Sequence, residues 1–376
     1  MGALDGLLVA DFSRVLAGPL AAMTLGDLGA DVIKVEPPGG DETRGWLPPV
    51  DGEGRSTYFL SVNRNKRSVV FDLKDADDLA LARELVSRVD VVIENFRPGT
   101  MARFGLDYGA VQSTNPGVVY CSISGFGEGK GATLPGYDPL VEAVSGLMSV
   151  TGPADGEASK VGVAVVDVIA GMNAATGILA LLRHRDRTGE GGRLAIDLLS
   201  SALAGLANQS SAFLSTGEAP TRHGNVHPSI EPFSTYAAAD GPMMICAGND
   251  GQFASLCGAL GLEDAADDPR YATNADRVAN REELRRAIEG ALASKDVAEW
   301  TELLNAAGVP AGPVNDIGGG YRMAGELGLD PVDEFEGTRT PASPIGIEGL
   351  PPVTRLAPPE LDQHGDEIRA WLTGDT

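Results

Sequence analysis

The alternation of short apolar runs with helix-like segments constrains the fold of this chain more than any other feature. Between the apolar runs, apolar residues recur at helical spacing. A β-α-β order of this kind places parallel strands in one sheet with helices on its faces, so the sequence predicts an α/β fold. Buried strands are predicted at 7–13, 31–36, 67–73, 90–96 and 117–124. The segment "GGRLAIDLLSSALAGLANQSSAFL" predicts a further strand that runs into a long helix.

The length and a change of composition predict two domains. A chain of 376 residues exceeds one ordinary hydrophobic core. The stretch "STGEAPTRHGNVHPSIEPF" is rich in glycine, proline and polar residues, and a linker is predicted at 201–225. We expect a large domain over 1–200, completed by the proline-rich end at 321–376, and a smaller α+β domain over 226–320.

Charge and cysteine content argue against several classes of partner. The chain has 53 acidic and 29 basic residues, a formal charge of −24, which disfavours binding to nucleic acid or to anionic membranes. No run of 18 apolar residues predicts a membrane span. The three cysteines form no C-x-x-C motif, and the N-terminus lacks the pattern of a signal peptide, so we expect a cytoplasmic protein.

Motifs for metals and nucleotides are also missing. His223 and His227 have no acid or cysteine at ligand spacing, so no metal is predicted. The first strand is followed by "SRVLAGPLAA" instead of G-x-G-x-x-G, which argues against a dinucleotide cofactor. The glycine-rich "GFGEGKG" at 125–131 departs from the Walker pattern, and we interpret it as a flexible loop over a cleft.

One acid stands in unusually apolar surroundings. Asp167 lies in "VGVAVVDVIAG", just before a helical pattern. An isolated carboxylate removed from water is costly unless something stabilises it. It could cap the helix that follows. It could also be a nucleophile kept ionised by the partial positive charge of the helix N-terminus. The two interpretations are compatible.

Several segments, taken in order, resemble the class III coenzyme A transferases. They include "DFSRVLAGPLAAMTLGDLGADVIKVEPPGGDETRGW", "FLSVNRNKRSVVFDLK", "DVVIENFRPGTMARFGLD" and "GVAVVDVIAGMNAATGILALLRHRDRTGEG". Further matches are "GNDGQF", "GVPAGPVND" and "APPELDQHGDEI", so the resemblance covers nearly the whole chain. It implies a Rossmann-like large domain, a small domain and a homodimer of interlocked subunits.

The resemblance implies a reaction and a nucleophile. The family moves CoA from an acyl-CoA donor, such as succinyl-CoA, to a carboxylic acid acceptor, and it needs no permanently bound cofactor. Asp167 matches the catalytic aspartate, which forms an aspartyl anhydride and then an aspartyl-CoA thioester.

The resemblance also implies binding residues. Positions that match CoA contacts are Arg14, Val15, Ala17, Lys74, Asn95, Phe96 and Arg103. Positions that match the acyl pocket or the glycine loop above the intermediates are Leu16, Trp46, Tyr137, Gly248 and Gly251. Arg14, Lys74 and Arg103 are candidates for pairing with phosphate.

Two departures bear on the reaction. Formyl-CoA transferases carry glutamine where this chain has Leu16, which argues against oxalate or formate specificity. The related 2-methylacyl-CoA racemases need a histidine where this chain has Tyr137, and a phenol with a pKa near 10 is a poor base at neutral pH. A transferase is therefore favoured. A racemase and a non-catalytic acyl-CoA-binding paralogue remain alternatives.

Overall fold

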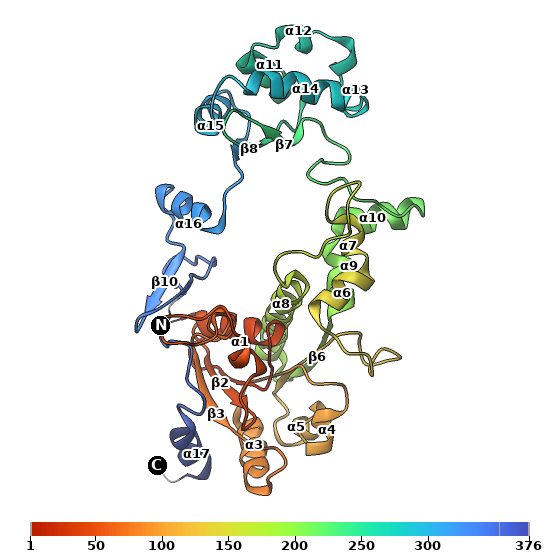
Figure 1. Cartoon of the computed structure of the whole chain (residues 1–376). Helices are drawn as coiled ribbons and strands as arrows, with labels where there is room; N and C mark the ends of the chain where they lie inside the picture. Colours follow the sequence, from red (N-terminus) through yellow and green to blue (C-terminus); the bar gives the residue numbers. More distant parts are fainter. Residues whose placement is uncertain (1, 353, 375–376) are drawn as a thin grey trace. The chain divides into compact units, whose positions relative to one another are not determined.

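The computed structural model describes residues 2–352 and 354–374 and divides the chain into two compact units (Figure 1). The first unit consists of the chain up to Met148, Lys160–Ala219 and the chain from Leu329 onward. The second consists of Ser149–Ser159 and Pro220–Gly328. The C-terminal part of the sequence therefore returns to the unit in which the chain begins.

A six-stranded parallel sheet forms the centre of the first unit, as the alternating pattern predicts. The strands are β1 (Leu8–Asp11), β2 (Asp31–Glu36), β3 (Lys66–Val70), β4 (Val91–Glu94), β5 (Val119–Ser124) and β6 (Gly192–Asp197). Their order is β3-β2-β1-β4-β5-β6, and every neighbouring pair is parallel. This order confirms the predicted Rossmann-like sheet. The chain direction across the sheet reverses between β1 and β4, where such folds form a ligand-binding crevice.

Helices cover both faces of this sheet. The helices of the first unit are α1 (Ala17–Asp27), α2 (Thr57–Ser61), α3 (Ala76–Arg88), α4 (Thr100–Phe104), α5 (Tyr108–Thr114), α6 (Asp138–Ser145), α8 (Val165–Thr188), α9 (Leu198–Gly205), α10 (Ala207–Thr216) and α17 (Gly365–Thr373). The 3-10 turn η1 (Glu42–Gly45) and the hairpin β10 (Val332–Phe335) and β11 (Thr338–Pro341) also belong to this unit.

Each face of the sheet has its own apolar core. On one face, Leu25 of α1 and Ile178 of α8 pack with residues of the strands. On the other, Leu85 of α3 and Ile368 of α17 belong to the second core. The last helix of the chain therefore covers the same face of the sheet as α3 (Figure 1).

Small residues let α1 and α8 approach closely. A Cβ atom added to Gly171 of α8 would lie 2.7 Å from the carbonyl oxygen of Ala17, which is closer than side-chain atoms pack. Ala170 and Ala174 of α8 and Ala21 of α1 are likewise buried in this contact. This close packing fixes the start of α8, and with it Asp167, next to the turn that follows β1.

Two details of the helices differ from the sequence analysis. The long helix expected after β6 is divided into α9 and α10, because Ala207 has a φ of +42°, which a continuous helix does not allow. By length and composition, α8 could cross a membrane, although no apolar run predicts a span. The same helix packs on α1, β5 and β6 inside the first unit, as a core helix does.

The second unit is a small α+β domain. Its antiparallel sheet has the order β7-β8-β9, with β7 (Phe233–Ala237), β8 (Pro242–Cys246) and β9 (Ala311–Pro313). Its core includes Tyr236, Ile245, Leu256 and Leu284. Its helices are α11 (Asp250–Leu260), α12 (Glu263–Ala266), η2 (Pro269–Tyr271), α13 (Asn274–Ala279), α14 (Arg281–Leu292), α15 (Val297–Ala306) and α16 (Ile317–Glu326). In the sequence, α7 (Leu147–Val150) lies at the boundary between the two units.

Candidate active site

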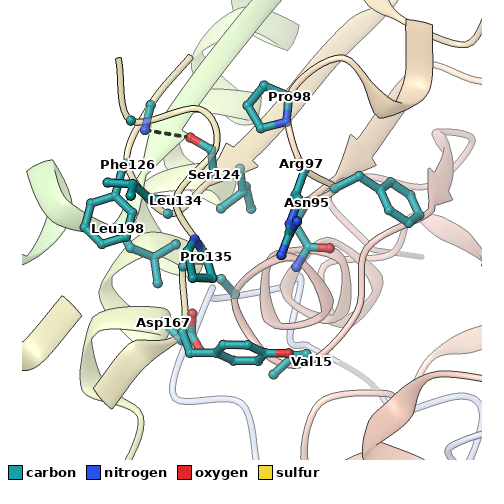
Figure 2. A pocket seen from close by; sticks show the side chains of 18 of the residues that line it. Val15, Asn95, Arg97, Pro98, Ser124, Phe126, Leu134, Pro135, Asp167 and Leu198 are labelled. Carbon is teal, nitrogen blue, oxygen red and sulfur yellow. Dashed lines mark hydrogen bonds between the residues drawn. The ribbon is translucent and has the colours of Figure 1, made fainter. Parts of the chain in front are cut away.

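A cleft of about 850 Å³ opens at the carboxyl ends of β1, β4, β5 and β6, beside the start of α8. It therefore spans the point at which the strand order reverses, where the fold predicts a ligand. Figure 2 shows Asp167 on one side, Asn95 and Arg97 on another, Ser124 at the end of β5, and Phe126 and Pro135 on the segment that follows. The lining includes Arg14, Val15, Leu16, Ala17, Glu42, Asn95, Phe96, Arg97, Tyr137, Asp167 and Leu198.

The turn after β1 is held in a strained conformation. Val15 has a φ of +70°, which is unusual for a β-branched residue. The amide of Asn95 accepts from the Arg14 backbone N–H at 2.9 Å and donates to the Arg14 carbonyl at 2.7 Å. The backbone N–H of Val15 donates to the Asp41 carboxylate at 3.3 Å. These contacts show why a residue with positive φ persists at the edge of the cleft.

A network of buried charges lies next to this turn. Lys34 Nζ donates to Asp41 Oδ2 at 2.9 Å and to the Ser13 carbonyl at 3.0 Å, and Lys66 Nζ donates to Asp11 Oδ2 at 2.9 Å. We call Asp11, Lys34, Asp41 and Lys66 the paired network. Burial alone would raise the pKa of the Asp41 carboxyl, but Lys34 and the Thr43 donors hold that pKa below its usual value. In this network each buried acid therefore has a cation as partner.

Asp167 is buried without such a partner. Asp167 is the third residue of α8 and is 9% exposed. No hydrogen bond to its carboxylate is present among residues 2–352 and 354–374. Burial, with a further contribution from the nearby Asp138 carboxylate, raises the pKa of Asp167 to about 7. This carboxylate is poorly solvated and more basic than an ordinary aspartate.

The interpretation of Asp167 as a helix cap is wrong. The residue that precedes α8 is Ala164, and it makes no side-chain cap. Instead, Asp138 Oδ2 accepts from the backbone N–H groups of Val166 at 2.8 Å and Asp167 at 3.1 Å. The cap is supplied from α6, 29 residues earlier in the chain, which leaves the carboxylate of Asp167 unused by the helix.

Tyr58 interacts both with Asp167 and with Trp46, one of the residues predicted to line the acyl pocket. Burial, followed by the charges of Asp167 and Asp138, raises the pKa of Tyr58 to about 12, so its phenol stays protonated. Trp46 packs edge-on against Tyr58 with ring centroids 4.8 Å apart. Trp46 itself is 37% exposed and is not among the residues that line the cleft.

A second cleft of about 1200 Å³ lies at the carboxyl ends of β2 and β3. It shares Arg14, Glu42 and Phe96 with the first cleft, and Lys74 also lines it. Arg103, in α4, is exposed and lines neither cleft, although the next residue, Phe104, lines the second. The structure thus places most of the predicted CoA-contact positions along two adjoining clefts.

The two predicted loop glycines lie in the second unit. Gly248 directly precedes α11, and Gly251 lies in its first turn. The Asn249 side chain caps this helix by accepting from the Gln252 N–H at 2.9 Å, and the Gly248 N–H donates to Gln252 Oε1 at 2.8 Å. Their contribution to the substrate pocket stays a prediction.

Four residues of this region were missed by the sequence analysis: Asp138, Glu142, Tyr58 and Arg97. Asp138 and Glu142 lie four residues apart in "YDPLVEAV", a spacing that could have indicated two acids on one helical face. Arg97 follows Asn95 and Phe96 directly. Nothing in the sequence near Tyr58 indicates its position. Within the described residues, no group of three His, Cys, Asp or Glu side chains could hold a metal ion.

Comparison with known proteins agrees with this geometry. Residues 4–365 match the sequence profile of CoA-transferase family III. The chain is 43% identical to a succinate–glutarate CoA-transferase of Agrobacterium fabrum, over 98% of this chain and 95% of the relative. It is 41% identical to an acetyl-CoA:oxalate CoA-transferase of Acetobacter aceti, with the same coverage. A crystal structure of a CAIB/BAIF family protein from Brucella suis superposes with a TM-score of 0.90 at 40% identity, covering 99% of both chains.

Proposed function

Because the chain belongs to CoA-transferase family III and is an acyl-CoA:carboxylate CoA-transferase, we propose that Asp167 is its nucleophile. Coenzyme A is then a co-substrate, and the partners of the enzyme are an acyl-CoA donor and a carboxylic acid acceptor. The observation that carries this assignment is the Asp167 carboxylate itself: it is buried in the cleft at the strand reversal, accepts no hydrogen bond from the described residues, and has a pKa near 7.

In the first half of the reaction, a carboxylate oxygen of Asp167 attacks the thioester carbon of the donor. The carbon–sulfur bond breaks, and CoA leaves as a thiolate, which gives a mixed anhydride. The thiolate then attacks the Asp167 carbonyl carbon of the anhydride. The donor acid leaves with the bridging oxygen, and an aspartyl-CoA thioester remains. Dividing the exchange into such steps conserves the thioester energy.

In the second half, the acceptor carboxylate attacks the aspartyl-CoA thioester and again releases the thiolate. The thiolate attacks the acceptor carbonyl of the new anhydride, and Asp167 leaves as a carboxylate. The donor acid thus leaves with one oxygen of Asp167, and the acceptor acid gives one oxygen to Asp167. The raised pKa suits this role, since a more basic carboxylate is a better nucleophile once it is ionised.

Cations along the two clefts suit the binding of a polyanionic substrate. Arg14 lines both clefts, and Lys74 lines the second. We assign them, together with Arg103, to the phosphates of CoA, which pair well with guanidinium and ammonium groups. Val15, Ala17, Asn95 and Phe96 complete this set, and no permanently bound cofactor is part of the proposal.

A small dicarboxylic acid is the proposed acceptor, with succinyl-CoA as donor. The relatives named above act on succinate, glutarate or oxalate by their names. Arg97 lines the cleft that contains Asp167, and its side chain makes no ion pair or hydrogen bond among the described residues. By contrast, a guanidinium nitrogen of Arg14 lies 3.4 Å from Oε1 of Glu42. A cation of this kind can hold the second carboxylate. Leu16, also in the lining, offers no hydrogen-bond donor, so oxalate is disfavoured.

A cytoplasmic homodimer is the proposed state of the enzyme. Met172 of α8 is 62% exposed and Leu214 of α10 is 81% exposed, and Leu203 of α9 and Phe213 of α10 are also open to solvent. A second copy that covered these apolar side chains would remove them from water. Sedimentation analysis of the whole protein tests this state.

Mass spectrometry tests the nucleophile directly. The protein is incubated with succinyl-CoA alone, digested, and searched for a CoA or acyl adduct on the peptide that contains Asp167. We expect the adduct in the wild type and its loss in Asp167→Asn. Asp186→Asn is the matched control, because Asp186 is an exposed acid of the same helix. Complete CoA exchange by Asp167→Asn would overturn the proposal.

A further inference from the structure

Two buried acids lie one helical turn apart on α6. Asp138 is 4% exposed and Glu142 is 1% exposed. Glu142 Oε2 accepts from the backbone N–H of Val161 at 2.7 Å, while Glu142 Oε1 has no donor among the described residues. Asp138 Oδ2 already accepts two N–H bonds from the first turn of α8. The pair therefore joins the helix that carries Asp167 to the segment that precedes it.

The two acids cannot both be ionised at low cost. Carboxylates at positions i and i+4 of a helix face each other, and like charges removed from water repel strongly. Burial raises the pKa of Glu142, and the hydrogen bond and charge of Asp138 raise it further. Asp138 acts only as an acceptor towards the backbone N–H groups of Val166 and Asp167, whereas Glu142 Oε1 has no donor among the described residues. The proton of the pair is thus best placed on Glu142.

We propose that Glu142 is a positioning residue for the transfer reaction: in its protonated form it donates an O–H bond to Asp138 and so holds Asp138 in place as the cap of α8. This inference rests on the proposed role of Asp167. Glu142 does not line the cleft, so it acts through Asp138 and not on the substrate.

The arrangement has two effects at the nucleophile. It fixes the first turn of α8, since the N–H groups of Val166 and Asp167 both point to one oxygen of Asp138. It also keeps a single negative charge beside Asp167, which is one cause of its high pKa. If Glu142 ionised as well, the repulsion would push Asp138 away from the N–H groups that it caps.

The other groups that face this pair are few. The charge of Lys160, which precedes α8, acts on Glu142. Tyr58 interacts with Asp138 and Asp167. Helix α9 packs on α6 but has no charged residue between Leu198 and Gly205. The charged and titratable groups around the pair are therefore Asp167, Lys160 and Tyr58.

Two substitutions separate positioning from packing. Glu142→Gln keeps the size of the side chain, its acceptor for Val161 and a neutral donor for Asp138. Glu142→Leu removes both hydrogen bonds. We expect adduct formation on Asp167 in Glu142→Gln to stay within a few-fold of wild type. In Glu142→Leu its rate should fall by about tenfold to a hundredfold, the scale on which a buried hydrogen-bond partner matters, with little change in succinyl-CoA affinity.

The pH profile gives a readout that a packing role would not change. In the wild type, the rate of adduct formation should rise as Asp167 ionises near pH 7. Burial and Asp138 raise the pKa of Glu142, and the loss of its proton should then produce a fall on the alkaline side. Glu142→Gln cannot ionise there, so the alkaline fall should disappear while the rise remains. An unchanged alkaline fall in Glu142→Gln, or a wild-type rate in Glu142→Leu, would overturn the inference.

An infrared measurement keeps the inference testable if Glu142→Leu does not fold. In addition to the band of partly protonated Asp167, the wild-type spectrum at pH 7 should contain the carbonyl band of a second protonated buried carboxylic acid, which is absent from Glu142→Gln. Identical bands in the two proteins would overturn the inference. A wild type that forms no adduct while the band difference is present would contradict the proposed function and the positioning role, but not the protonation of Glu142.

Discussion

Two groups of buried carboxylates lie at the carboxyl ends of the same sheet, and they are built in opposite ways. In the paired network, Asp11 and Asp41 each accept a bond from a buried lysine. In the second group, which we call the acidic group and which consists of Asp138, Glu142 and Asp167, no ion pair to a cation is present among the described residues. The first group holds the strained turn at Val15. The second leaves the proposed nucleophile, Asp167, without a cation to pair with its carboxylate.

The comparison shows how the same residue type serves structure in one place and chemistry in the other. A cation and several donors lower the pKa of a buried aspartate and make it a stable acceptor. Burial and a neighbouring acid raise the pKa of Asp167, so its ionised form is basic and poorly solvated. The difference predicts that substitutions in the two groups will separate activity from stability.

The largest effect on activity is expected for Asp167→Asn. Removal of a nucleophile lowers turnover by at least about a thousandfold, because the covalent route is lost. The stability of the protein should not fall, since no hydrogen bond to the Asp167 carboxylate is lost. Steady-state assays together with thermal melts check both. A melting temperature far below wild type would show that Asp167 has a structural role as well.

The reverse outcome is expected for Lys34→Met. This substitution leaves Asp41 buried without its cation, and breaking such a buried pair costs about 3–5 kcal/mol. The free energy of unfolding from denaturant titration should fall by that amount. A stability equal to wild type would mean that the paired network does not hold the turn. Lys295→Met, which removes a lysine from the second unit, is the control.

A smaller effect is expected at the edge of the cleft. Arg97→Gln should raise the KM for succinate or glutarate by about tenfold, the scale of one charge-assisted bond, while the KM for a monocarboxylic acceptor stays the same. Arg322→Gln, an exposed arginine of the second unit, serves as control. Equal changes for both kinds of acceptor would assign Arg97 to CoA instead of the acceptor acid.

The smallest expected effect is a pH-dependent shift in stability. The pKa of Asp167 is about 7 when folded and near 3.8 when unfolded, so the folded state binds the extra proton between these values. The stabilisation is present below pH 4 and is lost as the pH rises through 7. The melting temperature of Asp167→Asn should therefore equal that of the wild type at low pH and exceed it by a few degrees at pH 8. Parallel melting curves across this range would contradict the raised pKa.

The sheet could be predicted from the sequence because buried parallel strands are continuous apolar runs. Each of the five predicted runs overlaps a strand of the structure, and the sixth strand begins at Gly192, in the segment where a further strand is predicted. The paired network could not be predicted in this way. Lys34 and Lys66 lie inside strands, and only the strand order places them beside Asp41 and Asp11.

The proposed nucleophile of the candidate site could be predicted from the sequence, but the residue that caps its helix could not. Asp167 stood out because an acid in an apolar run is costly. One of the two interpretations of Asp167, a cap of the following helix, is wrong, because the residue that caps α8, Asp138, comes from another helix. Local spacing contains no signal for such a contact. The predicted long helix is interrupted at Ala207, although alanine favours a helix. The positive φ of this residue is therefore set by its surroundings in the fold and not by the local sequence.

The central claim is that Asp167 gives one oxygen to the donor acid and takes one oxygen from the acceptor acid in each turnover. One turnover with an acceptor acid labelled with oxygen-18 in its carboxylate tests it most directly. The account predicts that the peptide containing Asp167 gains one labelled oxygen and that Asp186 gains none. Transfer of CoA to the labelled acceptor without any label on Asp167 would contradict the account.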